Sequence, residues 1–240
     1  MSRITEAIVL AGGLGTRLRP VVADLPKGLA PVAGRPFLAW QLAGLAGQGI
    51  TRVVLALGYR AEMIRDVLGA RCEGIDLAYS LETEPLGTGG ALKRAAEGCR
   101  TPRVLALNGD TFLDFAAAAA EQALAPPAAA AIVLASVPDI SRYGAVEADD
   151  TGWVHASREK GGAGPGWING GVYALDLPEI SAFWPAEPAF SFERSVLPAL
   201  VAACRLRAVR ARGNFLDIGT PEDFARAQRE WGPRAGEPAS

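Results

Sequence analysis

The stretch AIVLAGGLGTRLRP, residues 7–20, predicts a strand that runs directly into a phosphate-binding loop. Residues 7–11 form an uninterrupted apolar run rich in branched side chains, which is typical of a strand buried on both faces. Three glycines follow within four positions, and glycine leaves backbone N–H groups free to face an anion. The guanidinium groups of Arg17 and Arg19 suit phosphate oxygens, which they bind in a forked geometry. The stretch therefore indicates a site for a nucleoside triphosphate.

Two common phosphate-binding fingerprints do not fit this loop. A P-loop needs Gly-x-x-x-x-Gly-Lys followed by Ser or Thr, and that spacing is absent. A dinucleotide fingerprint that starts at Gly13 needs a glycine at position 18, which is Leu18. The structural alternative is a glycine turn that only joins the strand to the next element.

Strand and helix patterns alternate over the rest of the chain. We expect buried strands at residues 53–57, 75–81, 104–107 and 131–137, and helices between positions 36 and 49, at 61–68 and from about 91. Such alternation predicts an α/β fold, Rossmann-like, with a mixed, mainly parallel central sheet flanked by helices. Ligands of such sheets bind at the carboxyl ends of the strands. The glycine loop follows the first strand and obeys that rule.

A second glycine motif, ETEPLGTGG at residues 82–90, follows the third strand. We expect its glycines to bring the backbone close to a ligand, and the helix that begins near Ala91 to favour negative charge. A carboxylate accepts hydrogen bonds only, and guanine presents an N1–H and an amino group side by side. Glu82 or Glu84 is therefore a candidate acceptor for guanine, and the sequence does not choose between them. A solvated acidic loop is the alternative.

Acidic residues also follow the fourth strand. Asp110 lies directly after it, beside both glycine loops, where Mg²⁺ with its preference for oxygen donors is expected. Asp114 is expected to cap a helix. His155 is the only histidine and alternates with apolar neighbours, so we expect an exposed strand position and no histidine metal site.

Composition limits the class of protein. At 240 residues we expect one domain over residues 1–240, with residues 231–240 as a frayed tail. The net charge of −2 provides no basic field for nucleic acid or an anionic membrane, and we expect neither as a partner. We also expect no signal peptide or membrane span. Three widely spaced cysteines, with no metal spacing, predict reduced thiols in a cytoplasmic protein.

The glycine loop, together with PKGLAPV at residues 26–32, resembles the signature of the sugar-phosphate nucleotidyltransferases. Those enzymes, with a glycosyltransferase-A-like fold, join a sugar 1-phosphate to a nucleoside triphosphate and release pyrophosphate. The chain departs from the usual pattern at Gly28, where proline is common, and this change removes no charged group. The resemblance covers about residues 5–228, and DLPK, RPFL, EPLGTGG and SRYG are most similar to D-glycero-α-D-manno-heptose 1-phosphate guanylyltransferases, which use GTP to make GDP-heptose.

The resemblance implies a set of site residues and Mg²⁺ as cofactor. It implies catalytic roles for Arg17, Lys27, Asp110 and Asp217, and Mg²⁺ binding by the two carboxylates. It implies nucleotide-binding roles for Leu10, Ala11, Gly12, Gly13, Gly15, Thr16, Arg17, Glu82, Glu84, Pro85, Gly87, Thr88, Asn108 and Gly109. It implies sugar-phosphate binding by Gly144, Glu159, Lys160, Asn169 and Gly170.

Other functions stay open at this point. Mannose 1-phosphate shares its ring stereochemistry with the heptose phosphate and is the second candidate substrate. A uridylyl- or thymidylyltransferase is disfavoured, because the carbonyls of those bases would repel a carboxylate. A non-catalytic subunit that senses sugar nucleotides would be expected to lose a charged site residue, and none is missing. The sequence allows a homo-oligomer and does not state its size.

Overall fold

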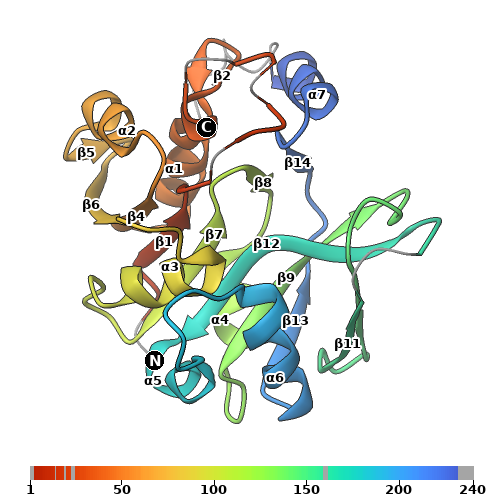
Figure 1. Cartoon of the computed structure of the whole chain (residues 1–240). Coiled ribbons are helices and arrows are strands. Elements are labelled where there is room, and N and C mark those ends of the chain that lie inside the picture. Colours follow the sequence, from red (N-terminus) through yellow and green to blue (C-terminus); the bar gives the residue numbers. More distant parts are fainter. Residues whose placement is uncertain (1–2, 14, 19, 23–24, 159–161, 232–240) are drawn as a thin grey trace.

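A mixed sheet lies at the centre of the molecule, with helices on both of its faces (Figure 1). The computed structural model describes residues 3–13, 15–18, 20–22, 25–158 and 162–231. Its strands are β1 (Glu6–Leu10), β2 (Pro31–Val32), β3 (Arg35–Pro36), β4 (Arg52–Leu57), β5 (Arg71–Cys72), β6 (Ile75–Leu81), β7 (Arg103–Asn108), β8 (Thr111–Leu113), β9 (Ala130–Val137), β10 (Ala145–Ala148), β11 (Val154–Arg158), β12 (Gly166–Asp176), β13 (Leu206–Arg210) and β14 (Phe215–Asp217). Its helices are η1 (Lys27–Leu29), α1 (Phe37–Gly47), α2 (Ala61–Leu68), α3 (Gly87–Ala96), α4 (Ala117–Gln122), α5 (Leu177–Ile180), η2 (Ser181–Phe183), η3 (Phe192–Val196), α6 (Leu197–Ala202) and α7 (Pro221–Trp231).

The centre of the sheet is parallel, as predicted. Strands β7, β1, β4 and β6 are neighbours in that order and all run in one direction. The long strand β12 pairs antiparallel with both β7 and β9, which makes the sheet mixed. Because the chain passes from β1 to β4 and β6 and only then to β7 on the other side of β1, the strand order reverses at β1. Ligands of open α/β sheets bind at such a reversal.

Side-chain alternation along the buried strands builds the two helical layers. On β1, Ala7 and Val9 join the apolar cluster that contains residues of α1, α2 and α4. Ile8 points the other way, into the cluster formed with α3, α5 and α6. Both faces of β1 are therefore covered, which confirms the prediction from its continuous apolar run.

Several predicted elements match the structure, and some differ for identifiable reasons. Helix α2 and strand β6 have the predicted bounds, and His155 is exposed on β11, as expected. The prediction that Asp114 caps a helix was wrong: α4 has Ala116 at its N-cap, and the Asp114 carboxylate accepts a hydrogen bond from the Asn214 N–H at 3.3 Å. This bond joins the segments around β8 and β14, which lie far apart in the sequence.

The described part of the chain also bears on the predicted membrane spans and cysteines. No described helix is long and apolar enough to cross a bilayer. Cys72, Cys99 and Cys204 are all free, as expected. The assignment of one domain to residues 1–240 stays a prediction. The prediction that the frayed tail begins at Trp231 was wrong, because Trp231 is the last residue of α7 and is buried. Residues 232–240 lie outside the described part of the chain.

A third apolar cluster packs helix α7 against the separate two-stranded sheet of β8 and β14. Trp231, only 5% exposed, packs against the rings of Phe37, Trp40 and Phe112 at centroid distances of 5.9, 5.0 and 4.8 Å. The same cluster contains Leu216, inside β14. Trp231 therefore supports the strand on which Asp217 lies.

We predict that Trp231→Ala lowers the free energy of unfolding by roughly 3 to 5 kcal/mol, because it empties the centre of this cluster. Urea unfolding followed by circular dichroism measures the loss. Val67→Ala is the control, since Val67 is 57% exposed and its truncation is expected to cost less than about 0.5 kcal/mol. Equal small losses in the two variants would contradict the assigned role of Trp231.

Candidate active site

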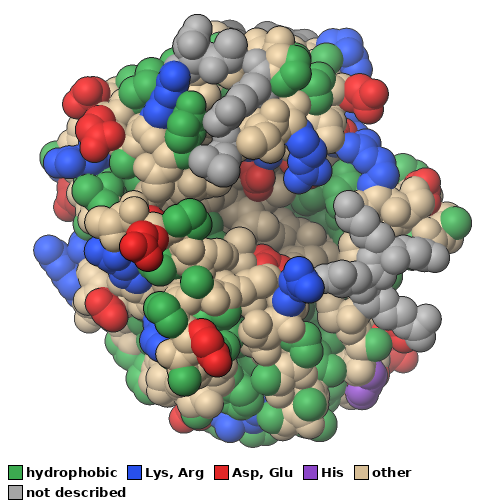
Figure 2. Space-filling view, viewed as in Figure 1, with side chains coloured by type: hydrophobic (Ala, Val, Ile, Leu, Met, Phe, Trp, Pro, Cys, Tyr) green, Lys and Arg blue, Asp and Glu red, His purple; other side chains and the backbone are tan. Residues whose placement is uncertain are grey.

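A cavity of about 570 Å³ lies at the carboxyl ends of the parallel strands β1, β4, β6 and β7. We call it the strand-end cavity, and it is lined by residues 10–13, 27–28, 58–59, 82–85, 87–88, 91 and 108–110. Viewed as in Figure 1, the surface is hollowed near its centre, with acidic and basic side chains beside the hollow (Figure 2). The strand-end rule thus led to a part of the molecule that can hold a ligand.

Most residues predicted to bind the nucleotide lie in this cavity. Those lining it are Leu10, Ala11, Gly12, Gly13, Glu82, Glu84, Pro85, Gly87, Thr88, Asn108 and Gly109. Lys27 and Asp110, predicted to be catalytic, line it too. Gly15, Thr16 and Arg17 do not, and the Arg17 side chain is exposed. Leu14 and Arg19 lie outside the described residues.

The first glycine loop packs closely against neighbouring loops because Gly12 has no side chain. A Cβ added to Gly12 would lie 2.6 Å from Oε1 of Glu82 and 3.1 Å from the backbone nitrogen of Gly58. The same addition at Gly13 would meet nothing within 4 Å. Gly12 is therefore needed for packing between loops, whereas Gly13 leaves open space at the cavity wall.

The second glycine motif is packed differently from the prediction. Helix α3 begins at Gly87, before the predicted Ala91, and the N–H groups of Gly89 and Gly90 donate to the carbonyl of Phe190 at 2.9 and 3.3 Å. A Cβ on Gly89 would lie 2.3 Å from the Phe190 ring. The expectation that Gly89 and Gly90 face a ligand was therefore wrong, because the chain around Phe190 occupies that space, whereas Gly87 and Thr88 at the N-terminus of α3 line the strand-end cavity.

The two candidate acceptors for guanine have different surroundings. Oε2 of Glu82 accepts a hydrogen bond from the Leu86 N–H at 3.1 Å, so this carboxylate supports its own loop. Glu84 is exposed, lines the cavity and has no hydrogen bond to another described residue. The geometry thus leaves both oxygens of Glu84 free to accept hydrogen bonds.

Lys27, Asp110 and Asp217 meet at the edge of the strand-end cavity. Lys27 Nζ donates to Oδ2 of Asp110 at 2.7 Å, and the Lys27 side chain is only 14% exposed. Asp217 ends β14, where it pairs with Thr111 of β8, and the next N–H, that of Ile218, donates to the carbonyl of Asp110 at 3.0 Å. Strand pairing therefore brings together two carboxylates that are distant in the sequence.

The Asp217 carboxyl is electrostatically unfavourable in its ionised form. Burial, and after it the negative charge of Asp110, raise the pKa of Asp217 above its ordinary value. The Lys27 ammonium group and a hydrogen bond from the Gly219 N–H lower the pKa of Asp217 but do not cancel these effects. A bound cation would remove the repulsion between the two carboxylates.

The predicted sugar side is described only in part. Asn169 Nδ2 donates to the Tyr173 hydroxyl at 2.6 Å, and Asn169 Oδ1 accepts from the Gly171 N–H at 2.9 Å. A Cβ on Gly170 would lie 2.6 Å from a methyl carbon of Leu113, so Gly170 serves a close contact between β12 and β8. Gly144 is half-buried and does not line the strand-end cavity. Glu159 and Lys160 lie outside the described residues.

An ion pair that the sequence did not indicate joins the predicted sugar-side loop to α7. Arg142 donates to Asp223 at 2.6 Å, and Asp223 is only 3% exposed. Asp223 also accepts from Thr220 Oγ1 at 2.8 Å, while the Asp223 N–H donates to Thr220 Oγ1 at 3.2 Å, so Thr220 caps the N-terminus of α7. This pair links the loop before Gly144 to the helix that follows Asp217.

Known proteins resemble this chain over most of its length. A family model described as nucleotidyl transferase matches residues 6–232. The chain belongs to this family. D-glycero-alpha-D-manno-heptose 1-phosphate guanylyltransferase of Aneurinibacillus thermoaerophilus is 40% identical to it, over 94% of the chain and 97% of the relative. The catalytic subunit beta of mannose-1-phosphate guanylyltransferase from Drosophila pseudoobscura pseudoobscura is 35% identical, over 92% of the chain and 60% of the relative.

A solved structure extends the comparison. HddC from Yersinia pseudotuberculosis, crystallised in complex with GMP-PN, matches this nucleotidyl transferase with a TM-score of 0.82 at 33% identity. The match covers 95% of this chain and 100% of HddC. The fold predicted from the glycine loop and the alternating elements is therefore that of a nucleotidyl transferase.

Gly28, where the family pattern usually has proline, is explained by packing in this nucleotidyl transferase. Residues 27–29 form the short 3₁₀ helix η1, and a Cβ on Gly28 would lie 2.6 Å from Cδ1 of Leu38 on α1. Gly58 and Tyr59, which the prediction left out, line the cavity after β4. The strand-end rule applied to residues 53–57 would have found them.

We predict that Asp217→Asn stabilises the protein in EDTA at pH 8 by about 1 kcal/mol. The pKa of Asp217 is higher in the folded protein than in the unfolded chain. Ionisation of Asp217 therefore lowers the free energy of unfolding once the pH exceeds the pKa of the unfolded chain. In acid Asp217 is protonated in both the folded and the unfolded protein, and this loss of stability is absent. The gain from the variant should therefore vanish as the pH falls towards 3. Thermal unfolding over this pH range measures it.

The matched control is Asp114→Asn, because Asp114 is exposed and the change keeps an oxygen that accepts from Asn214. Its stability is expected to stay within about 0.5 kcal/mol of the parent protein. Destabilisation by Asp217→Asn at pH 8 would contradict the account of a repulsive carboxylate pair.

Proposed function

We propose that this protein transfers GMP from GTP to D-glycero-α-D-manno-heptose 1-phosphate, giving GDP-heptose and pyrophosphate. The observation that carries this proposal is the 40% identity to a heptose 1-phosphate guanylyltransferase over 97% of that relative. The strand-end cavity supports it, since it combines open space at Gly13, the ammonium group of Lys27 and the carboxylate of Asp110.

Mannose 1-phosphate is the second candidate acceptor. The 35% identity to a mannose-1-phosphate guanylyltransferase subunit favours it, but this chain spans only 60% of that relative's length. The two sugars share ring stereochemistry and differ in the exocyclic tail, so the distinction depends on contacts to that tail. The match to the heptose 1-phosphate guanylyltransferase covers 97% of that relative, which favours the heptose phosphate over mannose 1-phosphate as the acceptor.

The proposed reaction is an in-line displacement at the α-phosphorus of GTP. An oxygen of the sugar 1-phosphate forms a bond to the α-phosphorus, the bond from that phosphorus to the bridging oxygen breaks, and its electron pair leaves with pyrophosphate. Such chemistry depends on positioning and on neutralisation of charge. We assign the loop after β1, with Arg17, to the β and γ phosphates and Lys27 to the α-phosphate. We assign Lys160 to the phosphate group of the sugar 1-phosphate, and Glu159 and Asn169 to the hydroxyl groups of the sugar.

The residues at the cavity edge fit Mg²⁺. The described residues contain no group of three or more His, Cys, Asp or Glu side chains placed to hold a metal ion. Mg²⁺, however, typically uses one or two carboxylates together with water and substrate phosphates. We propose that Asp110 and Asp217 hold it, because burial and the nearby charge of Asp110 raise the pKa of Asp217, and a cation would stabilise both carboxylates in their ionised form. When bound, Mg²⁺ supplies positive charge to the phosphate oxygens.

Cellular location and assembly belong to the same proposal. The free thiols of Cys72, Cys99 and Cys204 suit a reducing compartment, and we propose the cytoplasm. A homo-oligomer stays a prediction.

The experiment that tests the proposed function is a grid of pyrophosphate-release assays with Mg²⁺. GTP, ATP, UTP, CTP and dTTP are each paired with heptose, mannose and glucose 1-phosphates. We expect the fastest turnover with GTP and the heptose phosphate. GTP with mannose phosphate would support the second candidate. A preference for UTP or dTTP would contradict guanine recognition by a carboxylate, and no turnover with any pair would favour a sensing subunit.

We predict that Glu84→Gln raises the KM for GTP by about tenfold with little change in kcat, because loss of a hydrogen bond to a charged group costs roughly 1.5 kcal/mol. The parent enzyme should also discriminate against inosine triphosphate, which lacks the amino group of guanine, and the variant should discriminate less.

Glu82→Gln is the matched control, since its amide oxygen can still accept from the Leu86 N–H. Its KM for GTP should stay within about threefold of the parent value. A larger effect at Glu82 than at Glu84 would assign the base contact to Glu82 instead.

A further inference from the structure

Gln41 is a buried polar residue on the sheet-facing side of α1. It is 4% exposed, and its helix neighbours Leu38, Leu42 and Leu45 belong to the apolar core. Burial of an amide is unfavourable unless its polar atoms form hydrogen bonds. An apolar residue would fill the same space without the desolvation penalty of a buried amide. The hydrogen bonds of Gln41 therefore point to a role beyond packing.

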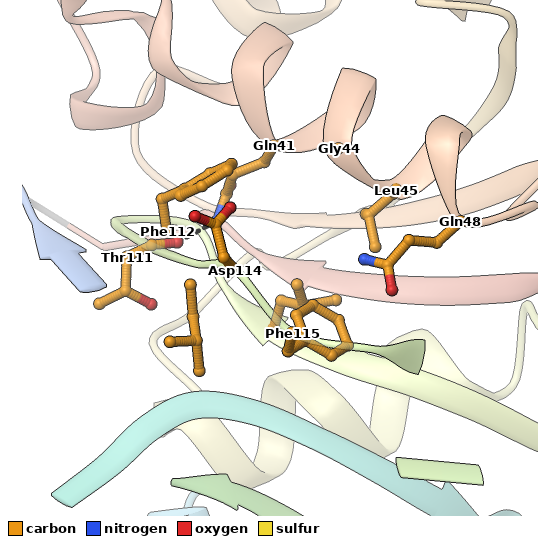
Figure 3. A pocket seen from close by; sticks show the side chains of 10 residues that line it. Gln41, Gly44, Leu45, Gln48, Thr111, Phe112, Asp114 and Phe115 are labelled. Carbon is orange, nitrogen blue, oxygen red and sulfur yellow. Dashed lines mark hydrogen bonds between the residues drawn. The ribbon is translucent and has the colours of Figure 1, made fainter. Parts of the chain in front are cut away.

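The side-chain amide of Gln41 holds the turn between β7 and β8. Nε2 donates to the carbonyl of Asn108 at 2.8 Å and to the carbonyl of Thr111 at 2.5 Å. These two carbonyls flank Gly109 and Asp110, so one amino group spans the turn that carries the Asp110 carboxylate. Figure 3 shows the Gln41 side chain reaching from α1 towards Thr111.

Two further contacts fix the same turn from other directions. The Gly109 N–H donates to the carbonyl of Leu10 on β1 at 2.8 Å, and the carbonyl of Asp110 accepts from the Ile218 N–H at 3.0 Å. Gln41 adds the support from the helical layer. Because Thr111 also pairs with Asp217, the position of Thr111 affects the spacing of both carboxylates.

Among the described residues, the amide of Gln41 is held by the two hydrogen bonds that its N–H groups donate. Its Oε1 atom, like Oγ1 of Thr111, has no hydrogen-bond partner among the described residues. A second cavity of about 240 Å³, which we call the helix cavity, lies beside them and is lined by Gln41, Gln48, Phe112 and Phe115 among others (Figure 3). A side chain that lost its donors would therefore have room to turn away and release the turn.

We propose that Gln41 is a positioning residue that sets the place of Asp110 relative to Asp217 through the carbonyls of Asn108 and Thr111. The proposal rests on the proposed function, in which these carboxylates hold the catalytic Mg²⁺. Gln41 touches neither substrate nor cation in this account. Its effect passes through the backbone of the turn.

The decisive variant is Gln41→Met, which keeps the length of the side chain and removes both N–H donors. Gln48→Met is the matched control, because Gln48 borders the same cavity and its Oε1 accepts from the Ala117 N–H at 2.6 Å, away from the turn. Gln41→Asn is the second variant, since it keeps the amide but is one methylene too short to reach both carbonyls. Thermal unfolding identifies which variants are folded.

The first readout needs no turnover. Amide hydrogen exchange of the unliganded proteins should be faster over residues 108–113 in Gln41→Met and Gln41→Asn, and unchanged there in Gln48→Met. Electron paramagnetic resonance of Mn²⁺ added with GTP should give a dissociation constant for Mn²⁺ about tenfold higher in the Gln41 variants than in the control.

The kinetic readout separates positioning from substrate binding. In the Gln41 variants we expect kcat to fall by about tenfold or more while the KM for GTP stays within about threefold. The proposal would be overturned if the Gln41 variants fold and have the same exchange rates, Mn²⁺ affinity and kcat as Gln48→Met. If the parent protein turned over no substrate pair, the proposed function would fail, and hydrogen exchange would still decide whether Gln41 holds the turn.

Discussion

The repulsion between two neighbouring carboxylates, Asp110 and Asp217, is the constraint around which the site is built. The ammonium group of Lys27 lies 2.7 Å from Asp110, yet burial and, after it, the charge of Asp110 still raise the pKa of Asp217. The fold tolerates this arrangement because it is held by backbone contacts and apolar packing on both sides. Pairing of β8 with β14 sets the two residues side by side, and the cluster around Trp231 keeps β14 in place. Under the proposed function, a cation bound together with the phosphates of the substrate would relieve this repulsion.

The parallel sheet brings the remaining groups to the same place. Loops after β1, β4, β6 and β7 all open at one end of the sheet, so residues from four separate segments line a single cavity. Close packing between the loops depends on Gly12, where a Cβ would collide with Glu82. Gly13, beside it, has open space, which is where phosphate groups would approach the backbone most closely. Gly12 thus permits close packing between the loops, and Gly13 leaves space for a ligand.

Much of this was predictable because the signals are local. The apolar run at residues 7–11 predicted a strand buried on both faces, and the strand-end rule placed Gly13, Glu84 and Asp110 near one another. The predictions failed where a distant segment decides the local structure. Gly89 and Gly90 resemble ligand-facing glycines until Phe190 is seen to occupy that space. Gln41 and Arg142 gave no signal either, because their partners lie 67 to 81 positions away in the sequence.

Anomalous diffraction from crystals grown with Mn²⁺ and a non-hydrolysable GTP analogue would locate the cation relative to the two carboxylates. We expect a manganese peak between the carboxylates of Asp110 and Asp217, in contact with phosphate oxygens of the bound nucleotide. A nucleotide bound in the strand-end cavity, with manganese located away from Asp217, would contradict the claim that the two carboxylates form the cation site.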